Sequence, residues 1–229
     1  MSEIKNHLLS VRHRVEEACR TVSRSPEEVT LLAVSKTKPV SLIEEAKAAG
    51  QSSFGENYVQ ELLSKYESLG SSVDWQMIGH LQRNKVKYII DKVSLIHSVD
   101  TVPLALEIEK QAAKKDLTAR ILLEVNIAGE ESKFGFTPEQ AREAAFQIRK
   151  LPHVQLLGLM TSAPFTEDPE TNRSHFRNLR LLAESLAADG LLDTEKPVLS
   201  MGMTGDFEVA VQEGATIVRI GTAIFGSRQ

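Results

Sequence analysis

Two stretches near the C-terminal end of the sequence, SMGMTGD (200–206) and RIGTAIFG (219–226), contain the residue types of an anion-binding site. Glycines let the backbone come close to a ligand, and threonine hydroxyls can donate hydrogen bonds to phosphate oxygens. The residues of these two kinds are Gly202, Gly205, Gly221, Thr204 and Thr222. Either stretch alone is as consistent with an ordinary turn as with a ligand site, whereas both together favour a phosphate site.

Lys36 follows the apolar run LLAV (31–34), where a buried strand is expected to end. A lysine there can be solvated, can pair with a phosphate or, when partly desolvated near other cations, can form a Schiff base. The residues alone favour the first two roles. Lys38 is the alternative reagent, but it lies beside Pro39 in the following loop, where we expect it to face water.

Arg219 lies within the run TIVRIG (216–221). Alternation along a strand places its side chain on the opposite face from Val218 and Ile220. An arginine that faced a helix layer would be unpaired and costly, so we expect it inside a barrel, near a ligand. The alternative is a structural ion pair with an interior carboxylate such as Glu124.

Eight short apolar runs alternate with amphipathic stretches and predict eight strands. The runs are VTLLAVS (29–35), SSFGE (52–56), DWQMIG (74–79), VSLIHS (93–98), ARILLEVN (119–126), VQLLGLM (154–160), KPVLSM (196–201) and ATIVRIG (215–221). Strands that alternate with helices indicate a parallel sheet. The pattern predicts an α/β fold, a TIM (β/α)8 barrel formed by residues 1–229 as a single domain, with an open doubly wound sheet as the alternative.

An additional helix is predicted before the first strand, because apolar residues recur there at steps of three and four. These residues are Ile4, Leu8, Val11, Val15 and Ala18. Only TAIFGSRQ (222–229) follows the eighth strand, which is too short for a full closing helix. We therefore expect the leading helix to cover the barrel beside the first and eighth strands.

Polar residues fall at the expected C-terminal ends of most strands, which is where TIM barrels build their active sites. They are Lys36, Glu56, Asn57, His80, Asn126, Thr161, Ser162 and the residues at 200–204 and 219–222. This pattern places Lys36 at the mouth of the barrel, across from the phosphate loops.

Composition argues against several classes of partner and site. The formal net charge of −4 gives no general electrostatic reason to bind nucleic acid or an anionic membrane. The single cysteine, Cys19, allows neither an intrachain disulfide nor a cysteine-type metal site. The N-terminal stretch lacks the apolar core of a signal peptide, and no later run is long and apolar enough to span a bilayer. We expect a cytoplasmic protein without a metal.

The motifs resemble those of the pyridoxal 5′-phosphate (PLP) homeostasis proteins, PLP-binding proteins also known as proline synthase co-transcribed homologues. The resemblance covers nearly the whole chain. It is carried by LLAVSKTKP, FGENYVQEL, WQMIGHLQRNKVKYI, IHSVD, GEESKFGF, GLMTSAPF and LSMGMTGDFEVAVQEGATIVRIGTAIFG. It implies a barrel like the N-terminal domain of alanine racemase, with PLP bound as an internal aldimine.

The resemblance also implies a role for each candidate residue. Lys36 is the Schiff-base lysine, Arg219 is the arginine beside the pyridine nitrogen, and Asn57 and His80 line the pocket. The phosphate-binding positions are Ser200, Thr204, Gly221 and Thr222. The chain departs from the family at Thr204, where serine is frequent, and at Gly205, where a larger residue is usual. Neither change should abolish phosphate binding.

The resemblance implies binding rather than established catalysis. A guanidinium keeps its proton at accessible pH, so Arg219 cannot fully protonate the pyridine nitrogen of PLP. The pyridine ring is then a weaker electron sink than it would be beside an aspartate. Alanine racemase takes an acid–base group from an additional β-domain and its dimer partner. We expect no such domain here, and no tyrosine that could supply the group follows Tyr88. We expect a monomeric PLP carrier or regulator, acting in vitamin B6 and amino-acid/keto-acid homeostasis, with PLP-dependent apoenzymes as recipients.

Two activities stay open as alternatives. A slow PLP-dependent amino-acid racemase or lyase would use Lys36 as its acid–base group on one face of the cofactor. A Schiff-base aldolase acting on a phosphosugar would use the same lysine and phosphate loops without PLP. A pyridoxyl group attached to another lysine, for instance Lys38 or Lys133, would contradict the assignment of Lys36.

Overall fold

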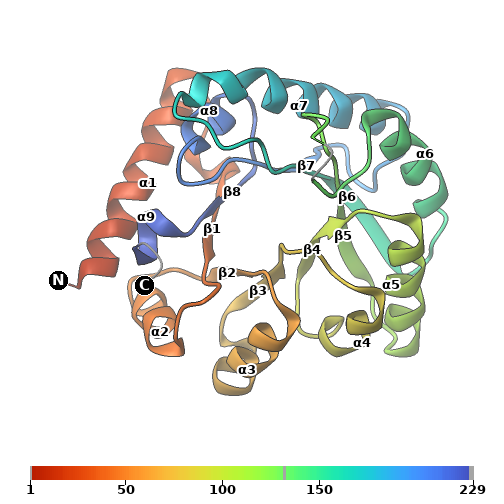
Figure 1. Ribbon diagram of the computed structural model, residues 1–229, viewed down its shortest axis with the longest axis horizontal. Coiled ribbons are helices and arrows are strands. Elements are labelled where there is room, and N and C mark those ends of the chain that lie inside the picture. The colour runs from red at the N-terminus through yellow and green to blue at the C-terminus, as the bar shows by residue number, and fades with distance from the viewer. Residues whose placement is uncertain (1, 131–132, 227–229) are drawn as a thin grey trace.

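Eight parallel strands close into a barrel with helices on its outside (Figure 1). The computed structural model describes residues 2–130 and 133–226. The strands are β1 (Thr30–Val34), β2 (Ser53–Glu56), β3 (Asp74–Met77), β4 (Leu95–Val99), β5 (Ala119–Glu124), β6 (Val154–Met160), β7 (Val198–Ser200) and β8 (Ile217–Ile220). Each pairs with the next, and β8 pairs with β1. The predicted barrel and its eight strands are confirmed.

The helices follow the strands in the expected alternation. They are α1 (Glu3–Thr21), α2 (Val40–Ala48), α3 (Val59–Leu69), α4 (Val86–Ile89), α5 (Val102–Lys114), α6 (Pro138–Ile148), α7 (Arg173–Ala188), α8 (Phe207–Gln212) and α9 (Thr222–Phe225). Local sequence sets several of their ends. For example, α6 starts with a capping box in which Thr137 and Gln140 satisfy each other's backbone N–H groups, with Pro138 in the first turn. No helix within the described ranges is long and apolar enough to cross a bilayer.

The leading helix α1 packs against α8, α9 and α2, on the side of the barrel formed by β8 and β1 (Figure 1). Its predicted apolar stripe, from Ile4 to Ala18, is buried. Arg14 fixes α1 to α8, because its guanidinium carbon lies 4.5 Å from the centre of the Phe207 ring and its Nε donates to Glu208 at 2.6 Å. The expectation that α1 compensates for a short closing helix is confirmed.

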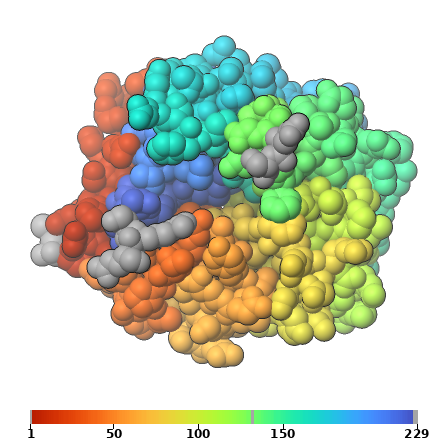
Figure 2. Space-filling view, viewed as in Figure 1, coloured from red at the N-terminus to blue at the C-terminus, as the bar shows by residue number. Residues whose placement is uncertain are grey.

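The loops that follow the strands meet on the face turned toward the viewer in Figures 1 and 2. In the space-filling view, segments from the beginning, middle and end of the chain surround the centre of this face (Figure 2). Below it, the barrel interior contains a separate apolar cluster of Leu32, Leu95, Leu122, Met160 and Ile217. Most of the other buried apolar side chains form a larger cluster, which includes the layer between the sheet and the helices.

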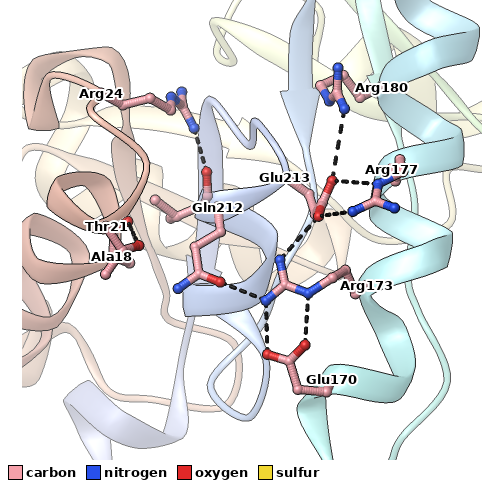
Figure 3. Close-up of polar contacts among 10 residues, drawn as sticks. Ala18, Thr21, Arg24, Glu170, Arg173, Arg177, Arg180, Gln212 and Glu213 are labelled. Carbon is pink, nitrogen blue, oxygen red and sulfur yellow. Dashed lines mark hydrogen bonds and ion pairs between the residues drawn. The ribbon is translucent and has the colours of Figure 1, made fainter.

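An ionic cluster fastens α8 to α7 (Figure 3). Three arginines of α7 converge on Glu213, which ends α8 and whose side chain is only 7% exposed. The distances to its carboxylate are 3.0 Å from Arg173, 3.0 Å from Arg177 and 3.8 Å from Arg180. Because α8 begins directly after the loop 201–206, this cluster helps to hold one of the predicted phosphate loops in place.

Candidate functional site

Lys36 lies, half-buried, in a tight turn directly after β1. The backbone N–H of Lys38 closes the turn by donating to the carbonyl of Ser35 at 3.0 Å. The side chain of Lys38 does not face water as expected. It is half-buried, and its Nζ donates to the carbonyls of Phe225 and Gly226 at 3.2 Å each, where α9 ends. A cation suits the negative end of a helix, so Lys38 has a structural partner in the protein.

The end of β1 neighbours the end of β8 and does not lie opposite to it. Ala33 pairs with Ile220 in the sheet, and a Cβ placed on Gly221 would lie 3.4 Å from Val34. Lys36 and the loop after β8 therefore stand side by side at the mouth of the barrel. The expectation that Lys36 sits across the barrel from the phosphate loops is corrected accordingly.

The two glycine-containing loops contact each other. The backbone N–H of Ala223 donates to the hydroxyl of Thr204 at 3.5 Å, and Thr222 is the first residue of α9. Gly202 has a φ of +88°, and a Cβ there would lie 2.5 Å from that of Ala210, so only glycine fits. A Cβ on Gly205 would meet no atom within 4 Å. The loop thus needs Gly202 for its path and leaves open space at Gly205.

Arg219 lies inside the barrel, as strand alternation predicts, and is 5% exposed. Its Nη1 donates to the carbonyl and the hydroxyl of Ser200, both at 2.7 Å, and its Nη2 donates to the carbonyl of Thr161 at 2.8 Å. Burial lowers the pKa of Arg219 to about 10, opposed by the charges of Glu124 and Asp206. The guanidinium is therefore cationic at neutral pH, and three of its five N–H groups are used by these bonds.

Ser200 joins Arg219 to a line of buried polar side chains across the barrel. The Ser200 hydroxyl lies 2.8 Å from Nδ1 of His97, and Nε2 of His97 lies 2.8 Å from Oε1 of Gln76. The Gln76 amide nitrogen donates to Asp74 at 2.7 Å, which identifies its other atom as the oxygen. A carbonyl oxygen only accepts, so Nε2 of His97 carries the hydrogen and Nδ1 accepts the hydrogen of Ser200.

This line of hydrogen bonds gives Ser200 a different role from the phosphate-binding role that the resemblance implies. Burial, and then the charge of Arg219, hold the pKa of His97 well below its ordinary value of 6.5, so the ring is neutral and can accept. The hydrogen of the fully buried Ser200 hydroxyl is committed to His97. Ser200 therefore has no hydroxyl hydrogen left to donate to a phosphate. In the structure Ser200 holds Arg219.

Glu124 lies close enough to Arg219 and to Asp100 for both charges to act on it. The pKa of Glu124 is raised to about 7, first by burial and then by the charge of Asp100, while the charge of Arg219 opposes both. Asp100 lies 2.9 Å from Nδ1 of His80, whose ring stacks on Phe134 with centroids 4.1 Å apart. Within the described ranges, no cluster of three or more metal-binding side chains is found.

His80 lies at the rim of the barrel mouth, with 42% of its side chain exposed. Together with Arg83, Asp100, Lys110 and Phe134 it lines a pocket of about 970 Å³. Neither Lys36 nor Arg219 is among the described residues that line this pocket. The role of His80 in the PLP pocket therefore stays a prediction.

Asn57 follows β2 and touches the loop after β3. A Cβ on Gly79 would lie 2.3 Å from the carbonyl oxygen of Asn57, so only glycine fits between the two loops. The side-chain oxygen of Asn57 is buried and has no hydrogen-bond partner among the described residues. A buried acceptor without a donor is costly, so this atom points to a ligand donor at the mouth of the barrel.

Lys133 is exposed, and its backbone N–H donates to the carbonyl of Glu130 at 3.1 Å. Residues 131–132 of the GEESKFGF motif lie outside the described residues.

Sequence reasoning missed His97 and Gln76, although a signal was present. Alternation in LIHSV and DWQM puts both polar residues on the interior face of adjacent strands. Interior polar residues in a small barrel need partners, and these two are each other's partner.

Comparison with known proteins agrees with the fold and the motifs. A family model, alanine racemase N-terminal domain, matches residues 7–229. The pyridoxal phosphate homeostasis protein of Aquifex aeolicus is 47% identical over 223 residues, which is 97% of each chain. The crystal structure of a protein from Bifidobacterium adolescentis has a TM-score of 0.92 and 36% identity, covering 98% of this chain and 97% of its own. The structure of PipY from Synechococcus elongatus with PLP bound has a TM-score of 0.85 and 34% identity, covering 98% of this chain and 100% of its own. The chain belongs to the pyridoxal phosphate homeostasis protein family.

Proposed function

We propose that this protein binds PLP at the mouth of the barrel and acts in PLP homeostasis. The observation that carries the proposal is the grouping of Lys36, Arg219 and the two threonine loops at the adjoining ends of β1, β7 and β8. A relative with 34% identity over nearly the whole chain has been solved with PLP bound. Bound PLP supplies an aldehyde that can be exchanged between amines.

The residues at this end of the barrel fit the parts of PLP. Thr204, Thr222 and the backbone N–H groups at the start of α9 suit its phosphate. Arg219, held as a cation by Ser200 and Thr161, has N–H groups that suit the pyridine nitrogen. The unpaired oxygen of Asn57 offers an acceptor to a ligand hydroxyl.

Lys36 is the residue we assign to the aldehyde. In this condensation the C=O bond of the aldehyde would be replaced by a C=N bond to the Lys36 nitrogen, with release of one water molecule, which gives the internal aldimine. The Nζ of Lys38 donates to the carbonyls that end α9, which gives this lysine a structural role.

The test is a visible absorption spectrum of the purified protein after addition of PLP, followed by borohydride reduction and peptide mapping. In the wild-type protein we expect an imine absorption band and a pyridoxyl group on the peptide that contains Lys36. In Lys36→Ala we expect the band to disappear and this peptide to carry no pyridoxyl group. A pyridoxyl group that maps to Lys38 or Lys133 in the wild-type protein would overturn the assignment. A protein that stays colourless with PLP would instead support a Schiff-base aldolase.

The wider role includes release of PLP to PLP-dependent apoenzymes by a monomeric, cytoplasmic protein, with effects on amino-acid and keto-acid balance. The single cysteine is typical of a reducing compartment. Transfer is measured by mixing the loaded protein with an apoenzyme and following the gain in its activity, and sedimentation gives the oligomeric state. Activation no faster than by an equal amount of free PLP would count against the carrier role.

One observation favours a second candidate, a slow amino-acid racemase or lyase. Glu124 has a pKa raised to about 7 by burial and by Asp100, which is near the ideal value for a proton-transfer group at neutral pH. The test of this candidate is to measure turnover across a panel of amino acids in the wild-type protein, in Lys36→Ala and in Glu124→Gln. Absence of turnover across the panel eliminates this candidate.

A further inference from the structure

A buried ionic cluster lies directly behind the turn that carries Lys36. Lys65 of α3 is 4% exposed, and its Nζ lies 2.7 Å from each of three oxygens. They are the carbonyl of Ser35, Oε1 of Glu56 and Oε1 of Glu61. The hydroxyl of Ser35 also donates to Glu56 at 2.6 Å, and the backbone N–H of Thr37 donates to Glu61. We call Lys65, Glu56 and Glu61 the α3 clamp.

The α3 clamp holds the residues on both sides of Lys36. Ser35 is held through its hydroxyl and its carbonyl, and Thr37 is held through its N–H. Thr37 has a φ of +64°, a left-handed conformation that costs a β-branched residue free energy and persists only when the surroundings impose it. The hydrogen bond from Thr37 to Glu61 is a contact from outside the turn that supports this conformation.

The composition of the α3 clamp is not explained by stability alone. Glu56 is fully buried, and its second carboxylate oxygen has no hydrogen-bond partner among the described residues. Buried ion pairs are weak contributors to stability, because desolvation of the charges offsets their attraction, and apolar residues of similar volume often do as well. What apolar residues cannot do is bond the backbone of Ser35 and Thr37. Holding that backbone is therefore the distinctive effect of the charged groups.

We propose that Lys65, Glu56 and Glu61 are positioning residues that fix the turn around Lys36 and thereby set how firmly this lysine retains the cofactor aldehyde. The inference rests on the proposed function, because it takes Lys36 as the point of attachment. Loosening the turn lets the Lys36 amine leave its position, so PLP binds more weakly and is passed to free amines faster.

Glu61 is the best residue to test, because its removal leaves the pair of Lys65 and Glu56 intact. Removal of Lys65 would leave Glu56 buried without its cation and could prevent folding. Glu61→Ala takes away the acceptor for Thr37, whereas Glu61→Gln keeps an oxygen in the same place. Glu67→Ala is the matched control, because Glu67 is an exposed glutamate of the same helix.

The first measurement uses the protein without PLP and follows amide hydrogen exchange at Thr37 by NMR. We expect exchange at least about tenfold faster in Glu61→Ala, because the acceptor for the Thr37 N–H is lost. We expect exchange closer to wild type in Glu61→Gln, which keeps a neutral acceptor for this N–H, and unchanged exchange in Glu67→Ala. The second measurement uses the loaded protein. We expect the dissociation constant for PLP, and the rate at which hydroxylamine takes the aldehyde from Lys36 as an oxime, to rise about tenfold in Glu61→Ala alone.

The outcomes separate the inference from the proposed function. Unchanged exchange at Thr37 in Glu61→Ala shows that the α3 clamp does not hold the turn, whatever PLP does. Faster exchange at Thr37 with unchanged PLP retention shows a purely structural cluster and overturns the positioning role. If wild-type protein carries no pyridoxyl group on Lys36, the proposed function fails, and the role in PLP retention fails with it.

Discussion

The hydroxyl of Ser200 lies 2.8 Å from Nδ1 of His97, and the direction of this hydrogen bond is fixed from both ends. Arg219 donates to the Ser200 oxygen, and Gln76 accepts from the other ring nitrogen of His97. Ser200 must therefore donate to His97. A serine that the family motif associates with phosphate is, in this chain, part of the support of an arginine.

Replacement of Ser200 tests this arrangement. Ser200→Ala leaves Nδ1 of His97 unpaired and removes one acceptor from Arg219, so we expect the free energy of unfolding to fall by about 1–3 kcal/mol. Because Ser200 has no hydrogen to donate to a phosphate, the preference of the protein for PLP over pyridoxal should not change. Urea denaturation measures the change in stability, and the dissociation constants for PLP and for pyridoxal measure the preference.

Thr222→Val provides the contrast for Ser200→Ala. Thr222 is exposed and begins α9, so its hydroxyl remains available to a phosphate. Loss of a hydrogen bond to a charged group should cost about 1.5–3 kcal/mol of PLP binding and little of pyridoxal binding. A drop in the preference for PLP in Ser200→Ala, with none in Thr222→Val, would reverse our assignment of the two hydroxyls.

His97 and Glu124 are expected to have opposite effects on the pH dependence of stability. Burial keeps the pKa of His97 below its ordinary 6.5, so the unfolded chain takes up a proton that the folded chain refuses, and stability is lost as pH falls below 6.5. Burial raises the pKa of Glu124 from an ordinary 4.5 to about 7, so stability is lost as pH rises between these values. Between about 4.5 and 6.5 the two slopes oppose each other.

Single substitutions separate these two slopes. In Glu124→Gln the His97 effect remains and lowers the free energy of unfolding by up to about 1.4 kcal/mol for each pH unit of acidification below 6.5, opposed by Glu56, whose pKa burial also raises. In His97→Gln the Glu124 effect remains, and stability should instead rise as pH is lowered from 7, by roughly 3 kcal/mol in total. Urea denaturation across this pH range is the measurement. Parallel curves for the two variants would contradict the assigned charge states.

The fold was predictable because its signals are local and repeated. Each strand is a short apolar run bounded by turn residues, and eight such runs alternating with helices leave few topologies. The leading helix was equally readable from the spacing of Ile4, Leu8 and Val11. These features depend on residues near each other in the sequence, so pattern alone could identify them.

The site was only partly predictable, because its contacts join residues far apart in sequence. Strand alternation placed Arg219 inside the barrel, but its bond to Ser200 depends on the register between β7 and β8. Lys38 was expected in water, and only the three-dimensional path of the chain brings it to the end of α9, 187 residues later. The positive φ of Thr37 has no signal in its own residue type, since threonine rarely adopts it.

Glu213 provides the last prediction, because its carboxylate contacts three arginines of α7 at once (Figure 3). Glu213→Gln leaves Arg173, Arg177 and Arg180 facing one another without the central carboxylate, so we expect α8 to be held less firmly. The free energy of unfolding should fall by about 1–3 kcal/mol, and the loss should shrink in high salt, which screens the repulsion among the arginines.

Glu184→Gln is the control for Glu213→Gln, because Glu184 pairs with Arg180 on the surface of the same helix and is half exposed. An exposed pair of this kind contributes at most about 1 kcal/mol, so this variant should stay close to wild type. Because α8 follows the loop of Thr204, Glu213→Gln should also weaken PLP binding, whereas Glu184→Gln should not. Equal losses of stability and of PLP binding in Glu213→Gln and Glu184→Gln would mean that the cluster acts only as surface charge and does not support the phosphate loop.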